Sequence, residues 1–231
     1  MLSRILEPEV MDSVEEARDY DSMDHSEVNR RFVDHLLEFS KTDVRDSVTS
    51  AQTTWTVLDV GTGTAQIPIE LAQRDRRIQI TAIDLANHML ELGQENVIRA
   101  NLSDRIHLRL IDAKELPFSN AGFHWVISNS IIHHIPEPLT ALGEMLRVLE
   151  PGGVLFVRDL LRPTDRSTLN NLVRLYAGES NQHQQQMFAD SLHAALSLAE
   201  VQDMLMDLGY PSDWAIQTTD RHWTIAGRKA T

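Results

Sequence analysis

The 231-residue chain contains no cysteine. This absence excludes disulfide bonds, thiolate-bound zinc, iron–sulfur clusters and a cysteine nucleophile. Basic residues are also few, because 21 Lys and Arg stand against 34 Asp and Glu and give a formal net charge of −13. A chain this acidic is repelled by a phosphate backbone. We therefore expect no nucleic-acid partner.

The sequence also lacks long apolar runs. No stretch approaches the roughly eighteen apolar residues that a membrane-spanning helix needs. Residues 1–12 have neither the apolar core nor the small-residue cleavage site of a secretory signal. A hydrophobic fraction of 42% with 24% charged residues is ordinary for a soluble globular chain. We expect a cytoplasmic protein with no membrane partner, and the sequence does not determine its oligomeric state.

What the chain does contain, from residue 55 onward, is an alternation of strand-like and helix-like segments. The strand-like runs are 55–60, 78–84, 106–112, 125–130 and 154–160, and the helix-like segments between them are 66–74, 87–100 and 138–149. Several of the strand-like runs are almost entirely apolar, as expected when both faces of a strand are covered. The alternation predicts an α/β fold with a doubly wound, mostly parallel sheet.

The segment before this alternation has a different character. Residues 25–40 carry apolar side chains at helical spacing, and the polar run 41–54 is typical of a loop. We expect residues 1–50 to form an N-terminal helical cap. The exposed apolar face of the 25–40 helix is compatible with either a lid or an interface between chains.

The segment after residue 160 departs from the alternation again. Residues 164–209 have helical periodicity throughout, and two strand-like runs within 214–228 flank Asp220 and Arg221. We expect an antiparallel hairpin that closes the sheet. The domain proper then covers 51–231, with a helical insertion at about 164–197.

The most informative stretch is a glycine loop between a strand and a helix, VLDVGTGTAQIPIEL at 57–71. Gly61 and Gly63 allow a tight turn and close approach of a ligand to the backbone, and the next helix presents free N–H groups. A tight turn without a ligand is the simpler interpretation. A dinucleotide-binding loop would have a third glycine where this chain has Gln66, which counts against a bound pyrophosphate.

Three carboxylates surround this loop in the expected topology. Asp59, Asp84 and Asp112 lie at or near the ends of three consecutive strand-like runs. The carboxyl ends of parallel strands meet at the crevice where doubly wound sheets bind ligands. Helix capping is the alternative role for Asp84 and Asp112. Acids in this position suit a ligand with amino and hydroxyl groups and suit a pyrophosphate poorly.

At this point the chain resembles the class I S-adenosylmethionine-dependent methyltransferases of the small-molecule type. The resemblance covers about 55–163 and is carried by five blocks in the family's order: LDVGTGTA (58–65), AIDLANHML (82–90), LIDAKELPF (110–118), FHWVISNSIIHHIPEP (123–138) and RVLEPGGVLFVRDLLRP (147–163). It implies a Rossmann-like seven-stranded sheet with a reversed last strand. It also implies S-adenosyl-L-methionine as the cofactor of the 51–231 domain.

The resemblance assigns five residues to the methionine end of the cofactor. Gly61 and Gly63 would pass under the methionine, and Asp59 would lie close to its amino group. Asn129 would lie near the methionine carboxylate or the transferable methyl group. Tyr20, in the run YDSMD (20–24), would belong to an N-terminal element that closes over the cofactor.

Five further residues fall to the nucleoside end. By the same resemblance, Asp84 would hold the ribose hydroxyls, and Leu85 and Met89 would flank the adenine. Asp112 would bond the adenine amino group, and Ala113 would contribute its backbone. All five lie in the second and third blocks of the resemblance.

Catalytic candidates are weaker. His133 and His134 follow the fourth strand and are candidates for a general base, because histidine titrates near neutrality; bonding to loop backbone is the simpler role. We expect no metal site, because adjacent histidines diverge and no further ligand stands at metal-binding spacing. Asp159 and Asp165 are expected to cap helices or to be solvated.

Together these observations favour an S-adenosylmethionine-dependent methyltransferase. It would act by in-line methyl transfer on an unidentified small-molecule acceptor. Two alternatives stay open at this point, an NAD(P)-dependent oxidoreductase on a related sheet and a non-catalytic S-adenosylmethionine-binding protein.

Overall fold

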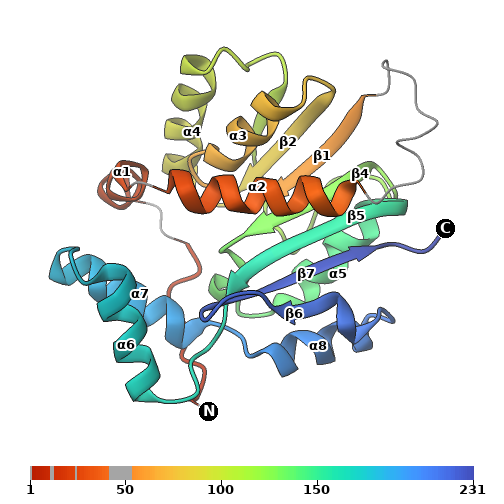
Figure 1. Cartoon of the computed structure of the whole chain (residues 1–231). Coiled ribbons are helices and arrows are strands. Elements are labelled where there is room, and N and C mark those ends of the chain that lie inside the picture. Colours follow the sequence, from red (N-terminus) through yellow and green to blue (C-terminus); the bar gives the residue numbers. More distant parts are fainter. Residues whose placement is uncertain (1, 11–12, 24, 42–53) are drawn as a thin grey trace. The chain divides into compact units, whose positions relative to one another are not determined.

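The computed structural model describes residues 2–10, 13–23, 25–41 and 54–231. Within these residues seven strands form one sheet in the order β3-β2-β1-β4-β5-β7-β6 (Figure 1). The strands are β1 (Trp55–Val60), β2 (Ile78–Asp84), β3 (Ile106–Leu110), β4 (Phe123–Asn129), β5 (Leu149–Leu160), β6 (Ala215–Gln217) and β7 (His222–Arg228). The predicted doubly wound α/β sheet is confirmed.

The described helices lie before and between these strands. They are α1 (Val14–Ser22), α2 (Ser26–Ser40), α3 (Gln66–Arg74), α4 (Asn87–Arg99), α5 (Pro138–Val148), α6 (Arg166–Ala177), α7 (Gln182–Ala194) and α8 (Leu198–Asp207). Two short 3₁₀ turns cover Ile132–His134 and Ser212–Trp214. No helix in the described ranges is both long and apolar enough to cross a bilayer. The predicted 41–54 loop falls almost entirely on residues 42–53, which lie outside the description.

The four strands β1 to β4 are parallel and end at the same edge of the sheet. Val60 at the end of β1 is paired with Ile83 of β2 on one side and with Ser128 of β4 on the other. Asp84 at the end of β2 is paired with Leu110 at the end of β3. The strand order reverses between β1 and β4, which is where a doubly wound sheet binds its ligand.

The C-terminal hairpin is reversed, as predicted. Gly152 donates to the carbonyl of Lys229 at 2.7 Å, and Leu161 donates to the carbonyl of Arg221 at 2.8 Å, so β7 runs antiparallel to β5. β6 is antiparallel to β7 in turn. β5 starts at Leu149, earlier than the predicted residue 154. The strand continues through Gly153, whose backbone packs closely against His124. A Cβ atom there would lie 2.7 Å from the carbonyl oxygen of His124.

Backbone contacts divide the chain into two compact units. Unit 1 consists of residues 1–9, 130–139 and 157–225, and unit 2 consists of 10–129, 140–156 and 226–231. Each has its own apolar core.

In unit 2, α2 is part of the core. Its residues Phe32, Val33 and Leu36 are fully buried among side chains of β1, β2, β4 and β5. The rings of Phe32 and Phe156 pack edge to face with their centroids 5.2 Å apart. Burying a side chain of this size contributes about 1.5–3 kcal/mol. The apolar face of the 25–40 helix is therefore covered within unit 2, alongside α3 (Figure 1).

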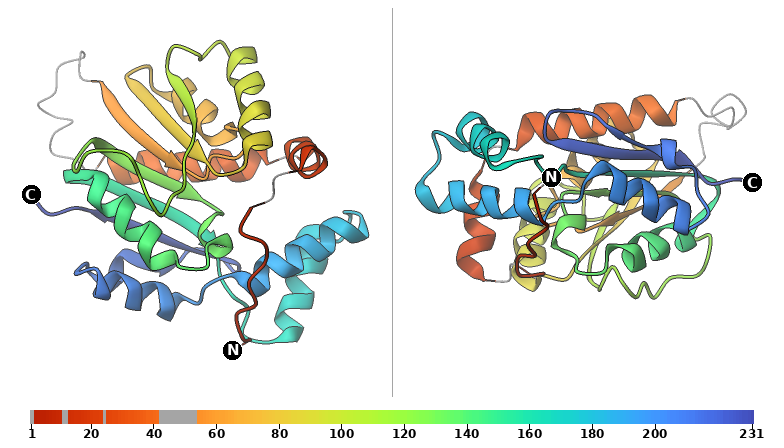
Figure 2. Two further views of the ribbon diagram at one scale, coloured as in Figure 1. Left: turned by 180° about the vertical axis from the view of Figure 1, so that it is seen from behind. Right: turned by 90° about the horizontal axis from the view of Figure 1, so that it is seen from below.

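In unit 1, α6 and α7 pack against each other over a small core of Leu160, Leu169, Leu172 and Leu192. The N-terminal segment runs beside α7 (Figure 2), where Ile5 donates its N–H to the carbonyl of His193 at 3.1 Å.

Three helices replace the continuous helical pattern predicted over 164–209, because side-chain caps interrupt it. The capping residues are Asp165, Asn181 and Ser197, and the last two form capping boxes. The expected capping role of Asp165 is confirmed.

Candidate functional site

The glycine loop joins β1 to α3 through three residues with positive φ. Gly61 has φ +75°, Gly63 has φ +54°, and Ala65, which precedes α3, has φ +62°. The first two positions favour glycine because a side chain is disfavoured in this region. The N–H groups of Gly61 and Thr62 both donate to the carbonyl of Ile83, at 2.8 and 2.9 Å. The loop is thus anchored to the end of β2.

Asp84 fixes the same loop from the end of β2. Its Oδ2 accepts a hydrogen bond from the N–H of Gly63 at 2.7 Å, and its Oδ1 accepts one from the N–H of Ala86 at 2.9 Å. The structural and ligand-binding interpretations of Asp84 are compatible. A carboxylate has about four acceptor positions, so the two backbone bonds leave capacity for hydroxyl donors of a ligand.

Asp59 is buried beside this loop, with 2% of its surface exposed. Its Oδ2 has no hydrogen-bond partner among the described residues. Burial raises the pKa of Asp59 to about 7, with Thr62 acting against the shift and Asp84 adding to it. A buried acceptor without a partner is costly. It is the feature expected where a ligand supplies an N–H donor.

Tyr20 of α1 lies against the glycine loop. A Cβ atom at Gly63 would be 3.7 Å from Cε1 of Tyr20. Burial, with the carboxylates of Asp84, Asp59 and Asp21, raises the pKa of Tyr20 to about 12. Within unit 2, α1 therefore covers the loop. Asp24, the end of the YDSMD run, lies outside the described residues.

The residues predicted for the nucleoside end follow β2 and β3. Leu85 is exposed, whereas Met89 is buried with Ala86 of the same turn. Asp112 accepts the N–H of Lys114 at 2.8 Å and lies 3.1 Å from its ammonium nitrogen. Two more predicted residues complete this edge of the sheet: the buried Ala113 and the partly buried Asn129 at the end of β4. All ten predicted cofactor residues belong to unit 2.

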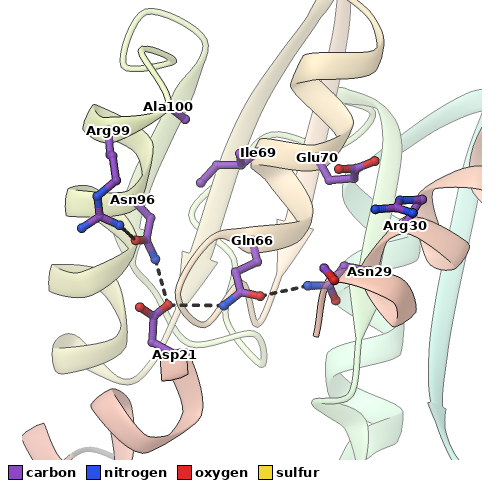
Figure 3. Close-up of a pocket in the computed structure, with 10 residues that line it drawn as sticks. Asp21, Asn29, Arg30, Gln66, Ile69, Glu70, Asn96, Arg99 and Ala100 are labelled. Atoms are coloured by element: carbon purple, nitrogen blue, oxygen red, sulfur yellow. Dashed lines mark hydrogen bonds between the residues drawn. The ribbon is translucent and has the colours of Figure 1, made fainter. Parts of the chain in front are cut away.

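A polar network that the sequence did not predict surrounds Gln66 (Figure 3). Its Nε2 donates to Oδ1 of Asp21 at 3.3 Å, and its Oε1 accepts from Nδ2 of Asn29 at 3.1 Å. Asn96 of α4 also donates to Oδ1 of Asp21, at 2.9 Å. This network joins α1, α2, α3 and α4 along a cleft of about 470 Å³. None of the ten predicted cofactor residues is among the described residues that line this cleft.

The only sequence signal for this network was the polar residue at position 66, where a dinucleotide loop has glycine.

The close approach of α4 to the glycine loop was also not predicted. A Cβ atom at Gly93 would lie 3.3 Å from the carbonyl oxygen of Gly63. Gly93 therefore lets α4 pack directly on the glycine loop.

The two histidine candidates lie in unit 1, in the turn that follows β4. Nδ1 of His133 is 2.5 Å from Oδ1 of Asp159, and its Nε2 is 3.5 Å from Oε1 of Glu7. Burial lowers the pKa of His133, but the two carboxylates outweigh burial and raise it above its ordinary value. Burial and the neighbouring His133 lower the pKa of His134 to about 3. His133 is therefore already engaged with carboxylates, and His134 is too weakly basic to take up a proton near pH 7.

We expected Asp159 to cap a helix or to be solvated, and the structure shows that it is not solvated. It is fully buried and accepts hydrogen bonds from the N–H groups of Ile132 and Leu160 as well as facing His133. The sequence showed no apolar or polar pattern that distinguishes this aspartate from an exposed one.

The family model described as a methyltransferase domain matches residues 57–153, which include the glycine loop and nine of the ten predicted cofactor residues. Over these residues the chain resembles the class I S-adenosylmethionine-dependent methyltransferases, in agreement with the resemblance found in its sequence. This match supports S-adenosylmethionine as the cofactor. The residues present fit this ligand, because the unpartnered Oδ2 of Asp59 suits an amino group and the acceptor capacity of Asp84 suits hydroxyl groups.

The chain is similar to a ubiquinone/menaquinone biosynthesis C-methyltransferase of Geotalea daltonii, with 32% identity over 46% of each chain. It is also similar to a 27-O-demethylrifamycin SV methyltransferase of Amycolatopsis mediterranei, with 28% identity over 75% of this chain and 61% of that one. The chain spans about half the length of the curated quinone-pathway relatives it matches. Among solved structures, a methyltransferase from Aquifex aeolicus has the same fold, with a TM-score of 0.64, 18% identity, and coverage of 94% of this chain and 98% of the other.

Proposed function

We propose that this protein transfers the methyl group of S-adenosylmethionine to a small-molecule acceptor. One observation carries the proposal. Within unit 2, the carboxylates of Asp59, Asp84 and Asp112 lie at the carboxyl-terminal edge of three neighbouring parallel strands, around a glycine loop. This arrangement offers acceptors for an amino acid, a ribose and an amino-substituted base. It suits a pyrophosphate poorly, because three carboxylates surround the loop and Lys114 is paired with one of them, Asp112.

In this proposal each carboxylate has one task. Asp59 holds the cofactor's amino group, which would supply the donor that its Oδ2 lacks. Asp84 holds the ribose hydroxyls while it keeps the loop in place through Gly63. Asp112 receives the adenine amino group. Gly61 and Gly63, having no side chains, leave room beneath the methionine portion.

Bound S-adenosylmethionine supplies an electrophilic methyl group on a positively charged sulfur. The protein's main tasks are therefore to align the acceptor with that methyl group and to exclude water. Tyr20, which lies over Gly63, supports a role for α1 in excluding water from the loop. Neither His133 nor His134 is needed if the acceptor reacts without losing a proton to the protein.

The relatives suggest where to look for the acceptor. Their names refer to ubiquinone and menaquinone precursors and to a demethylated rifamycin. We propose an acceptor of the same general class, a small organic molecule rather than a nucleic acid. The formal charge of −13 supports this choice, because it disfavours association with a polyanion. The cytoplasm stays the predicted compartment.

The test is transfer of an isotope-labelled methyl group from S-adenosylmethionine to a panel of small acceptors, with NADH oxidation measured in parallel. The panel should include demethylated quinols and hydroxylated natural products. Labelled product that disappears in Asp84→Ala supports the proposal. Binding of S-adenosylmethionine with no product across the panel favours a non-catalytic binding protein, and NADH binding in place of S-adenosylmethionine favours an oxidoreductase.

A further inference from the structure

Unit 1 contains a buried cluster of metal-ligating side chains that the proposed function does not use. Glu7 comes from the N-terminal segment, and His133 and His134 come from the turn after β4. One potential ligand atom from each of the three lies within 4.8 Å of the other two. We propose that Glu7, His133 and His134 bind a divalent transition-metal ion, with Zn²⁺ as the best-fitting species.

Two of the three separations between ligand atoms are close to those around a tetrahedral ion, and the third is within 4.8 Å. Oε1 of Glu7 lies 3.1 Å from Nδ1 of His134 and 3.5 Å from Nε2 of His133. Nitrogen and oxygen ligands bound to tetrahedral Zn²⁺ at about 2.0–2.1 Å are about 3.3 Å apart. The observed separations lie on either side of that value. A set of two histidines and one carboxylate leaves a fourth position for water or another ligand.

Two of the three proposed ligand atoms make no hydrogen bond to the described residues. Oε1 of Glu7 and Nδ1 of His134 are buried, and neither makes a hydrogen bond within the described residues, although they are only 3.1 Å apart. A hydrogen-bonded network without metal accounts for Nδ1 of His133, which faces Asp159, but gives Oε1 of Glu7 no hydrogen bond from Nε2, which is 3.5 Å away. It leaves the other two atoms unsatisfied, which is costly in a buried position. A bound cation satisfies both.

The surroundings also have the form of a metal site. Nδ1 of His133 faces Asp159 at 2.5 Å, so its Nε2 is the nitrogen directed at Glu7. A carboxylate on the far nitrogen commonly orients a metal-binding histidine and increases its basicity. The other oxygen of Glu7, Oε2, accepts a hydrogen bond from Ser191 at 3.4 Å, which leaves Oε1 for the ion.

The local charge is compatible with a cation. The carboxylates of Glu7 and Asp159 and the guanidinium of Arg4 act on the ring of His133, and two carboxylates outweigh one guanidinium. Arg4 donates to the carbonyls of His133 and Ile135 at 3.1 and 3.0 Å, which holds the turn that carries both histidines. This proposal departs from our expectation from sequence that no metal binds.

The ion would connect the N-terminal segment to the turn after β4. Two segments of unit 1 that are far apart in sequence would be joined by coordination bonds as well as by the hydrogen bonds from Arg4 to the carbonyls of His133 and Ile135. Metal binding then stabilises the folded state, because the unfolded chain does not hold the three ligands together. This consequence can be measured without cofactor or acceptor, so it is independent of the proposed methyl transfer.

The experiment uses the full chain, stripped of metal with a chelator and dialysed. Zn²⁺ affinity is measured by competition with a chromophoric chelator, and Co²⁺ is added separately to record the visible absorption of a four-coordinate ion. We expect one ion per chain and a higher melting temperature with Zn²⁺. We expect at least tenfold weaker binding in Glu7→Gln and in His134→Ala.

Matched controls are the exposed residues Glu179 and His183 of the same unit. Glu179→Gln and His183→Ala should bind Zn²⁺ like the unmodified chain. Circular dichroism shows whether each variant is folded, and Glu7→Gln changes the side chain least. A folded, metal-stripped chain that binds neither Zn²⁺ nor Co²⁺ overturns the proposal. Unchanged affinity in folded Glu7→Gln overturns it equally.

Discussion

At the scale of single residues, Asp59, which we propose binds the cofactor, shows how such a position can cost stability. Its carboxyl group is buried without a partner for one oxygen, and burial raises its pKa to about 7. An unfolded aspartate has a pKa of about 3.9. The folded state therefore binds the proton more tightly than the unfolded state does. The resulting stability is complete at low pH and is lost as the pH rises towards 7.

We predict that Asp59→Asn flattens this dependence. Between pH 5 and pH 8 the ligand-free protein should lose about 2–3 kcal/mol more unfolding free energy than the variant, from the difference between the two pKa values. Urea unfolding of both proteins at both pH values measures the effect, and other titrating groups cancel in the comparison. Parallel pH profiles would show that Asp59 ionises normally.

At the scale of elements, the glycine loop depends on how closely α4 approaches it. Gly93 has the carbonyl oxygen of Gly63 and atoms of Thr64 and Ala65 within 3.3–3.4 Å of the place where a Cβ would stand. Alanine would favour the helix by about 0.5–1 kcal/mol, but it would displace the loop. We predict that Gly93→Ala stays folded and binds S-adenosylhomocysteine at least tenfold more weakly.

The control for that experiment is Glu95→Ala, an exposed position on the same helix. It raises helix propensity without approaching the loop and should bind S-adenosylhomocysteine normally. If Gly93→Ala also binds normally, the loop can move without losing the ligand.

The hydrogen bonds of Gln66 lead to a separate prediction about stability and ligand choice. Gln66 bonds to Asp21 of α1 and Asn29 of α2, and a hydrogen bond of this kind contributes about 0.5–1.5 kcal/mol. Gln66→Ala should lower the unfolding free energy by about 1–2 kcal/mol in urea titrations. Gln66→Gly, which restores the third glycine of a dinucleotide loop, should not create NADH binding. NADH binding by that variant would revive the oxidoreductase interpretation.

The sequence predicted the bounds of strands and helices better than the side-chain clusters that join them. β1, β2 and α3 have the predicted bounds, because apolar strands bounded by a glycine loop carry their own limits. The predicted start of β5 was wrong, because the pair Gly152 and Gly153 is typical of a turn. Only the close packing of Gly153 against the carbonyl oxygen of His124 shows that the strand continues through them. The strand-end carboxylates followed from topology alone.

The clusters that join distant segments could not be predicted. Glu7 and His134 meet only through the fold of unit 1, and neither carries a periodic or spacing signal that points to the other. The same holds for Asp21 and Asn96 in unit 2. Local sequence patterns predict helices, strands and strand ends, whereas side-chain networks depend on how segments distant in sequence pack together.

At the scale of the whole molecule, we propose a division of labour between the cofactor residues of unit 2 and the helical segment 164–197. We predict that Leu175→Ser, on α6 where 68% of the leucine is exposed, leaves S-adenosylhomocysteine affinity within about twofold. Exchange of the whole 164–197 segment for that of a relative should alter acceptor preference in the labelled-methyl assay. Unchanged acceptor preference after the exchange would remove this segment from substrate selection.

The most direct measurement is calorimetric titration of the purified chain with S-adenosylhomocysteine, with Asp84→Ala and the exposed control Asp104→Ala alongside. We predict micromolar binding, about −8 kcal/mol, by the unmodified chain and by Asp104→Ala. Asp84→Ala should bind at least tenfold more weakly, because it loses both the ribose acceptor and the bond to Gly63. Folded, unmodified protein that does not bind S-adenosylhomocysteine would contradict the assignment of the glycine loop and its three carboxylates to this cofactor.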